Sequence, residues 1–246
     1  MLHLLEETMK NFSLLIALSI LFSADDKAPN QRTRDRDVDI HHIKIDVTVD
    51  LEEKSVSGNV THTLSAFNSS LSEFALDAED MEIHRVILDG KDISYNHHGE
   101  KVFLSLNKPI GWDDTVKVRL DYTAYPRRGT FFIAPDSVYP EKPWQAWTQG
   151  EDTDNHHWVP IYDYPNDKAT FETILTVDKK FLAISNGELV SLKENKDGTH
   201  TWHWHEHFPM VSYLISYVIG EFEKVEDSYN GIPVNYWVYE ENKQET

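Results

Sequence analysis

The segment from Thr201 to His207 reads TWHWHEH, and it is the first stretch whose residue types could do chemistry. In a strand, His203, His205 and His207 share one face at a spacing of roughly 6.5 to 7 Å. Adjacent histidines at that spacing could share a metal ion. The pattern specifies no carboxylate and no fourth ligand, so it does not define a metal site by itself.

A helical zinc site is excluded at the same place. The signature His-Glu-x-x-His would need a second histidine at position 209, where Pro209 stands, and proline does not fit inside a helix. The alternation instead predicts a solvent-facing or cross-strand histidine row, with Trp202 and Trp204 on the opposite, buried face.

Other catalytic patterns are missing from the sequence. There is no cysteine, which excludes thiolate zinc ligands, cysteine nucleophiles and disulfides. Neither a Gly-rich phosphate loop nor Gly-x-Ser-x-Gly occurs. The pairs His41-His42, His97-His98 and His156-His157 are weaker metal candidates than the TWHWHEH segment. We therefore expect no catalytic residue and no metal ligand in this chain.

Composition limits the class of partner. The 246 residues include 42 acidic and 23 basic side chains, for a formal charge of −19. Such a surface repels phosphate backbones, so we expect no nucleic-acid partner. An apolar fraction of 40% and an aromatic fraction of 12% are typical of a folded globular chain. The excess of acidic residues either keeps the surface solvated and the protein soluble, or attracts cationic peptides.

The elements that must position any site have the period of strands. Ile43, Ile45, Val47 and Val49 share one face of an expected strand. Further strands are expected at the following segments: Val60 to Phe67, Val86 to Leu88, Val102 to Leu106, Val116 to Tyr122, Phe171 to Val177, Trp202 to His207 and Tyr213 to Ile219. Tight turns are expected at Asp89-Gly90, Asn186-Gly187 and Asp197-Gly198. No long stretch has helical periodicity.

This array predicts an all-β fold of twisted antiparallel sheets, saddle-like or sandwich-like, because consecutive short strands joined by tight turns pair with their neighbours. We expect one domain over residues 38–227 and a last strand within 228–246. Residues 25–37 form a polar linker.

The apolar run from Phe12 to Phe22 is too short to span a membrane and fits the central region of a signal peptide. Lys10 supplies the preceding positive charge if translation starts at Met9. We therefore expect a signal peptide over residues 1–24, no membrane span, and export to a periplasmic or secreted location. Cleavage is expected near Ser23 or Ala24.

The segment from Trp144 to Phe171 combines aromatic residues, acids and prolines without a clear period. It predicts a long structured loop, and long ordered loops are where binding residues tend to lie.

Several motifs resemble the N-terminal domain of the aminopeptidase N family of zinc metallopeptidases, which includes leukotriene hydrolase. They run in the family's order through Val47 to Gly58, Arg128 to Phe132, Thr148-Gln149-Gly150-Glu151, Trp158 to Pro165, Lys168 to Phe171, Ser185-Asn186-Gly187, Pro209 to Leu214 and Gly220-Glu221-Phe222. The resemblance covers nearly everything after residue 38.

The sequence departs from the family pattern in two ways. His156-His157 stand where arginine is common, Ile161 replaces the usual cysteine, and Tyr164 replaces the usual glutamate. More seriously, the Gly-x-Met-Glu-Asn motif, the His-Glu-x-x-His helix, the downstream glutamate ligand and the catalytic tyrosine belong to a domain that this sequence lacks. The resemblance implies that the chain is a truncated front part, inactive alone.

The resemblance also implies a role for two residues. Glu151 matches the glutamate that binds the free α-ammonium of the substrate, and Gln149 would form a polar wall of the S1 site. The complete enzyme would use zinc to polarise the peptide carbonyl. Its partners would be peptide N-termini and a C-terminal catalytic zinc domain of the same polypeptide.

A second hypothesis is a freestanding, non-catalytic exported β module. It would bind peptide or glycan through Trp144, Trp147 and Trp158, since exposed aromatic rings are common in such platforms. The first hypothesis predicts a zinc domain encoded downstream, and the second predicts saturable binding without turnover.

Overall fold

The computed structural model describes residues 33–244. The chain divides into two units, Met1–Asp35 and Arg36–Thr246, and the second contains the fold described below. The predicted signal peptide lies outside the described residues. Among the residues described, no helix is both long enough and apolar enough to cross a membrane.

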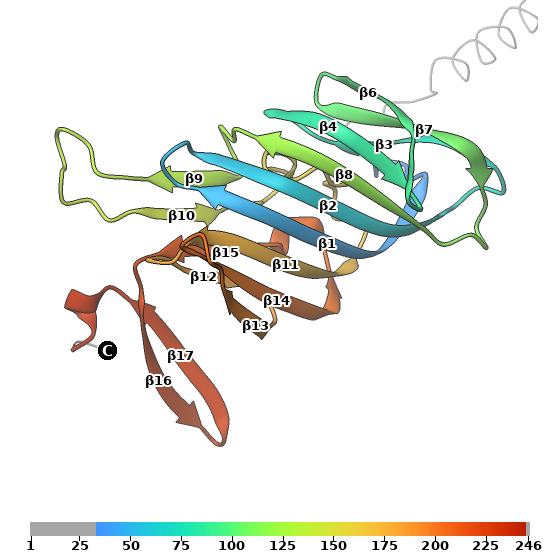
Figure 1. Cartoon of the computed structure of the whole chain (residues 1–246). Coiled ribbons are helices and arrows are strands. Elements are labelled where there is room, and N and C mark those ends of the chain that lie inside the picture. Colours follow the sequence, from blue (N-terminus) through green and yellow to red (C-terminus); the bar gives the residue numbers. More distant parts are fainter. Residues whose placement is uncertain (1–32, 245–246) are drawn as a thin grey trace, which may run out of the picture. The chain divides into compact units, whose positions relative to one another are not determined.

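A large curved sheet forms the centre of the second unit (Figure 1). Its strand order is β13 (Glu188–Glu194), β14 (Thr199–Met210), β11 (Ala169–Asp178), β1 (Val38–Asp50), β2 (Ser55–Ala66), β8 (Val116–Ala124), β4 (Met81–Leu88) and β5 (Lys91–Asp92). Neighbouring strands are antiparallel, except that β1 and β11 are parallel.

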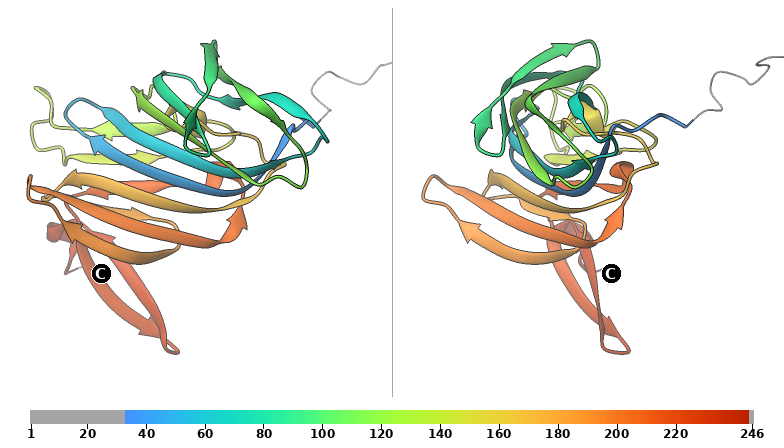
Figure 2. Two further views of the ribbon diagram at one scale, coloured as in Figure 1. Left: turned by 45° about the vertical axis from the view of Figure 1, so that its right-hand side comes forward. Right: turned by 90° about the vertical axis from the view of Figure 1, so that its right-hand side faces the viewer.

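Smaller sheets complete the architecture. One contains β12 (Leu182–Ser185), β15 (Tyr217–Gly220), β10 (Gln145–Thr148) and β9 (Thr130–Ile133), and another contains β3 (Leu71–Asp77), β7 (Lys101–Ile110) and β6 (Ser94–His98). The hairpin of β16 (Glu223–Tyr229) and β17 (Ile232–Val238) extends away from these sheets (Figure 2). The only helical elements described are the 3₁₀ turns η2 (Asn155–His157), η3 (Ser212–Leu214) and η4 (Glu240–Asn242). The predicted all-β class is confirmed. The predicted domain boundary at Asp227 falls inside β16.

The core consists of the inward faces of these strands. On β1, Ile43, Ile45, Val47 and Val49 are all buried, as their alternation predicts. Each such side chain contributes about 1.5 to 3 kcal/mol when it is fully removed from water. The apolar face of β1 thus holds the middle of the large sheet in place.

Two local predictions are confirmed. Asp89 and Gly90 both have positive φ, 46° and 83°, in the tight turn between β4 and β5. On β14, Trp202 and Trp204 are buried, while His203 Nε2 donates a 2.6 Å hydrogen bond to Oε2 of Glu172 on the neighbouring strand. The TWHWHEH segment is therefore a cross-strand histidine row.

The expectation of a strand from Tyr213 to Ile219 is wrong for its first half. Residues Ser212–Leu214 form η3, and β15 begins only at Tyr217. The reason is a competing hydrogen-bond partner, because the amide of buried Asn155 donates to the carbonyls of Ser212 and Ile215 at 2.6 and 3.1 Å. The Ser212 carbonyl also accepts the N–H of Ile215 at 3.0 Å, so the backbone closes a 3₁₀ turn there instead of pairing along a strand edge.

His62 is a titratable residue on the core face of β2. It is 0% exposed, and its Nε2 lies 2.9 Å from the carbonyl oxygen of Pro160. Its Nδ1 has no hydrogen-bond partner within residues 33–244. Burial lowers the pKa of His62 to about 4, although the hydrogen bond to Pro160 acts in the opposite direction. The neutral ring, donating from Nε2, is the form that fits this site.

This burial predicts acid sensitivity. Since the folded-state pKa lies below the unfolded value, the unfolded chain binds a proton more readily, and stability falls as the pH drops from about 6.5 toward 4. We expect His62 to cost about 2 kcal/mol of stability between pH 7 and pH 5. His62→Gln keeps a donor for Pro160 but does not titrate, so urea unfolding of this variant should lose that much less over the same interval. The matching change at exposed His41, His41→Gln, should leave the pH dependence as it is. An equal loss in His62→Gln and the unsubstituted chain would contradict the assignment.

Candidate functional site

The Thr148-Gln149-Gly150-Glu151 segment leaves the end of β10 and is fastened on both sides. The backbone N–H of Tyr217 donates to Thr148 Oγ1 at 3.0 Å, and the N–H of Gln149 donates to the carbonyl of Gly129 at 2.9 Å. These bonds attach the segment to β15 and to the turn before β9. The β12-β15-β10-β9 sheet therefore provides its base.

Two glycines permit the close packing of this loop. Gly129 has φ +73°, and a Cβ there would lie 1.9 Å from the carbonyl oxygen of Asp154. A Cβ at Gly150 would lie 2.6 Å from both polar side-chain atoms of Asn155. Real Cβ atoms do not approach that closely, so both positions require glycine. Glycine is needed at positions 129 and 150 because both backbones pack closely against the same turn, at Asp154 and Asn155.

Asn155 is the anchor of the turn. Its side chain is fully buried and makes three hydrogen bonds: Nδ2 donates to Ser212 and Ile215, and Oδ1 accepts a 2.8 Å bond from Trp158 Nε1. Trp158 is itself 0% exposed and packs edge-on against Tyr217, with ring centroids 5.2 Å apart. The turn therefore has little freedom to move relative to β15.

The two predicted substrate-binding residues, Gln149 and Glu151, lie together on the exposed side of this frame. Both side chains are exposed to solvent. Within residues 33–244 the Glu151 carboxylate has no hydrogen bond or ion pair, and the peptide bond between Glu151 and Asp152 is cis. The arrangement presents an unpaired carboxylate on a fixed base. A carboxylate of that kind can accept charge-assisted hydrogen bonds from a cation.

The segment after Glu151 contains His156, a histidine whose pKa is shifted by its neighbours. His156 Nδ1 lies 3.1 Å from Asp163 Oδ2, and the backbone N–H of His156 donates to the same oxygen at 3.0 Å. Burial lowers the pKa of His156, but the hydrogen bond to Asp163 raises it, as do the charges of Asp163, Asp77 and Glu79. The net effect is a raised pKa. His156 thus sits in a negative environment.

The tryptophans proposed for a peptide or glycan platform do not form one surface. Trp158 is fully buried as a packing anchor, which overturns its assignment to such a platform. Trp147 is half-buried and stacks on Phe131, with ring centroids 4.7 Å apart. Trp144 is also half-buried and lies elsewhere, at the pocket described next.

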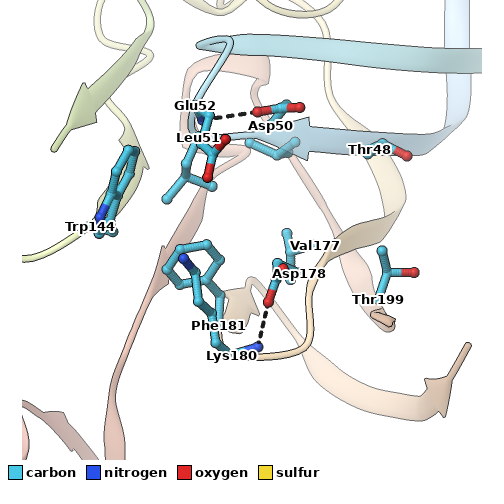
Figure 3. A pocket seen from close by; sticks show the side chains of 11 residues that line it. Thr48, Asp50, Leu51, Glu52, Trp144, Val177, Asp178, Lys180, Phe181 and Thr199 are labelled. Carbon is cyan, nitrogen blue, oxygen red and sulfur yellow. Dashed lines mark hydrogen bonds between the residues drawn. The ribbon is translucent and has the colours of Figure 1, made fainter. Parts of the chain in front are cut away.

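A pocket of about 280 Å³ opens beside Trp144 (Figure 3). Its walls come from the β1-β2 turn and from the segment between β11 and β12, where Lys180 Nζ lies 4.8 Å from the Phe181 ring centroid and 5.5 Å from that of Trp144. The carboxylates of Asp50 and Asp178 each accept a hydrogen bond from a backbone N–H group two residues further on, in their own turns. Neither Glu151 nor Gln149 lines this pocket.

One group of described side chains has the composition of a metal site: Glu79, His156 and His157. From the sequence, the His156-His157 pair is a weaker metal candidate than the TWHWHEH segment. Glu79 lies 77 residues before His156, so no local spacing could have indicated it. The role of Asn155 was missed for a similar reason, since all but one of its partners are distant in sequence.

The family follows from a match over most of the chain. The model of the peptidase M1 N-terminal domain matches residues 39–214. The chain therefore belongs to the peptidase M1 N-terminal domain family, and the resemblance drawn from the motifs is confirmed.

Individual relatives agree with this assignment. Probable aminopeptidase 1 of Saccharolobus solfataricus is 30% identical over 161 residues, covering 65% of this chain and 20% of that protein. Aminopeptidase N of Lactobacillus helveticus is 23% identical over 215 residues, covering 82% of this chain and 24% of that protein. The chain spans between 18% and 32% of the length of the curated relatives that it matches.

Solved structures share the fold. An M1 zinc metallopeptidase of Deinococcus radiodurans, bound to a Tyr-Ser-Ala substrate, has a TM-score of 0.69 and 23% identity, covering 81% of this chain and 47% of that chain. At this identity the likeness shows the fold alone. Several relatives are named aminopeptidases and the solved structure is named a metallopeptidase, and both names denote hydrolases.

The anchor role of Asn155 predicts a loss of stability when its amide is removed. Asn155→Ala leaves the buried Trp158 indole N–H without its acceptor and removes a donor from the carbonyls of Ser212 and Ile215, although the Ser212 carbonyl keeps the N–H of Ile215. We expect a loss on the order of 3 kcal/mol in the free energy of unfolding, measured by urea denaturation. Asn107 is an exposed control whose amide makes one hydrogen bond, to Asp92. Asn107→Ala should change stability by less than about 0.5 kcal/mol. Similar losses in the two variants would contradict the anchor role.

Proposed function

We propose that this chain is the substrate-side N-terminal domain of a zinc aminopeptidase, which removes residues one at a time from peptide N-termini. The observation that carries the proposal is the exposed, unpaired carboxylate of Glu151 on a rigid base, within a chain of the peptidase M1 N-terminal domain family. Several relatives are named aminopeptidases, which supports the same reaction for the complete protein.

Glu151 would bind the α-ammonium of the substrate. Charge-assisted hydrogen bonds between a carboxylate and an ammonium are worth about 1.5 to 3 kcal/mol. An internal peptide bond offers no ammonium, so its binding would leave the carboxylate desolvated and unpaired. That difference would restrict cleavage to the first residue. Gln149, exposed beside it, would contribute a polar wall to the site of the first side chain.

The chemical step would belong to a domain C-terminal to this chain. Zinc would supply polarisation of the scissile carbonyl and activation of water. The ligand motif that the resemblance assigns to this zinc is absent from the 246 residues. Within the described residues, this chain's part is to bind and orient the peptide N-terminus.

Export is part of the proposal. Its support is the apolar run from Phe12 to Phe22 and the small residues that follow it. Sequencing the mature N-terminus should find a start close to Ala24 or Asp25. Retention of residues before Phe12 on the mature protein would contradict export by this route.

The proposed role of Glu151 predicts a kinetic defect in the polypeptide that carries the zinc domain. Glu151→Gln keeps the shape of the side chain but removes its charge, and kcat/KM on a dipeptide substrate should fall by about ten- to a hundredfold or more. The native protein should also discriminate strongly against the N-acetylated form of that substrate, because acetylation removes the ammonium. In Glu151→Gln this discrimination should shrink by a comparable factor.

A matched control is Glu194→Gln, an exposed glutamate at the end of edge strand β13. This variant should have native kcat/KM on both substrates. Unchanged kinetics in Glu151→Gln, or a fall that is equal for free and acetylated substrates, would overturn the role assigned to the carboxylate.

A further inference from the structure

His156 and His157 lie in η2, against the loop between β3 and β4. Antiparallel pairing of Asp77 with Ile161, and the 3.0 Å hydrogen bond from the N–H of Glu79 to the carbonyl of His156, hold the two segments together. The rings of His156 and His157 are stacked, with centroids 4.5 Å apart and planes inclined by 28°. Two adjacent residues therefore direct both rings toward the same loop.

The outer nitrogens of both rings converge on one carboxylate. His156 Nε2 lies 3.7 Å and His157 Nε2 lies 3.8 Å from Glu79 Oε2. These separations are too long for hydrogen bonds. They are close to the spacing of about 3.3 to 3.6 Å between ligand atoms around a tetrahedral ion with metal–ligand distances of roughly 2.0 to 2.2 Å. All three ligand atoms lie within 4.8 Å of one another.

The other nitrogen of each ring is held by a separate carboxylate. His156 Nδ1 lies 3.1 Å from Asp163 Oδ2, and His157 Nδ1 lies 2.9 Å from Asp80 Oδ2. An acceptor at Nδ1 places the proton there and leaves the lone pair on Nε2, pointing toward Glu79. Metal-bound histidines characteristically have such a carboxylate behind them, which fixes the tautomer and the ring orientation.

The supporting carboxylates are themselves constrained. Asp163 Oδ1 accepts a 2.8 Å hydrogen bond from the hydroxyl of Ser212, and Asp80 Oδ1 accepts a 2.6 Å bond from Arg127 Nε. The two histidine rings are therefore fixed from behind before any ion arrives. Preorganisation of this kind reduces the ordering cost of binding.

We propose that Glu79, His156 and His157 form a binding site for a divalent transition-metal ion of the zinc, cobalt or nickel type. Two imidazole nitrogens and a carboxylate oxygen favour these ions over calcium or magnesium, which prefer oxygen ligands alone. Asp154 Oδ1 lies at the edge of the site, 3.9 Å from His157 Nε2 and 3.6 Å from Arg128 Nε, and the three ligand atoms leave a fourth position for water. The bound ion ties the β3-β4 loop to the segment that follows Glu151.

The ion has a route to the site. The His157 side chain is 4% exposed and that of His156 is 14% exposed, but Glu79 and Asp154 are exposed to 27% and 22%. Arg127 Nη2 contacts Glu79 through the other carboxylate oxygen, at 3.4 Å, and leaves Oε2 for the ion. The site thus has a buried imidazole floor and a more accessible carboxylate rim.

The test is metal binding by the full chain without a histidine tag and after treatment with a chelator. Added Co²⁺ should give the visible absorption of a low-coordinate cobalt site, with an endpoint at one ion per chain. Zn²⁺ should abolish that absorption by competition and should raise the melting temperature, since an ion that binds only the folded state stabilises it.

We expect Co²⁺ binding to weaken by about 100-fold or more in each of the variants Glu79→Gln, His156→Gln and His157→Gln. Asp80→Asn should weaken it by roughly 10- to 100-fold, because Asp80 acts only through His157. Glu79→Gln is the safest variant for folding, since Glu79 is partly exposed, and circular dichroism checks each protein. His84→Gln, an exposed histidine elsewhere, should bind as the unsubstituted chain does.

His203→Gln separates this site from the histidine row on β14. Unchanged Co²⁺ binding in this variant supports the proposal. Loss of binding in His203→Gln with retention in His156→Gln would place the ion on the row and overturn the proposal. The absence of both the cobalt absorption and the zinc-dependent thermal shift in the folded, unsubstituted chain would overturn it as well.

Discussion

The hydrogen bonds of the buried Asn155 amide are the constraint on which the rest of the site depends. One side chain joins three parts of the chain: it binds carbonyls in the Ser212–Ile215 segment, receives the indole N–H of Trp158, and fills the space that only a glycine at position 150 leaves open. A buried amide must find partners, because leaving them unmade costs about 1 to 3 kcal/mol for each group. The turn that carries Glu151 is therefore held by polar bonds that few alternative conformations could satisfy.

The hydrogen bonds of Asn155 also connect the β12-β15-β10-β9 sheet to the exposed loop that carries Glu151. β9, β10 and β15 form a base, and buried Tyr217 at the start of β15 contacts Trp158 through its ring and Thr148 through its backbone N–H. Because the base is rigid, the carboxylate of Glu151 can remain exposed without being free to move far. A binding group with fixed position loses less entropy when a ligand arrives. This is the physical link between the β-rich frame and the role in binding peptide N-termini that we propose for Glu151.

Much of the frame could be predicted from the sequence because its signals are local. The alternation along β1, the Asp89-Gly90 turn and the buried face of Trp202 and Trp204 all follow from a period of two and from backbone preferences. The family motifs also located Gln149 and Glu151 in one exposed loop. What could not be predicted depends on distant contacts. The parallel pairing of β1 with β11, the inward position of His62, and the replacement of a strand by η3 are each decided by partners far along the chain. The meeting of Glu79 with the His156-His157 pair is of the same kind.

Reading the gene in frame past the codon for Thr246 tests most directly whether this domain forms the substrate side of a zinc aminopeptidase, as we propose. We expect a Gly-x-Met-Glu-Asn motif, followed by His-Glu-x-x-His, within the next few hundred codons. Such a sequence would place the zinc ligands in the same polypeptide as Glu151. An authentic stop codon directly after Thr246 would contradict the proposed function, favour a freestanding binding domain, and remove the catalytic meaning of Glu151.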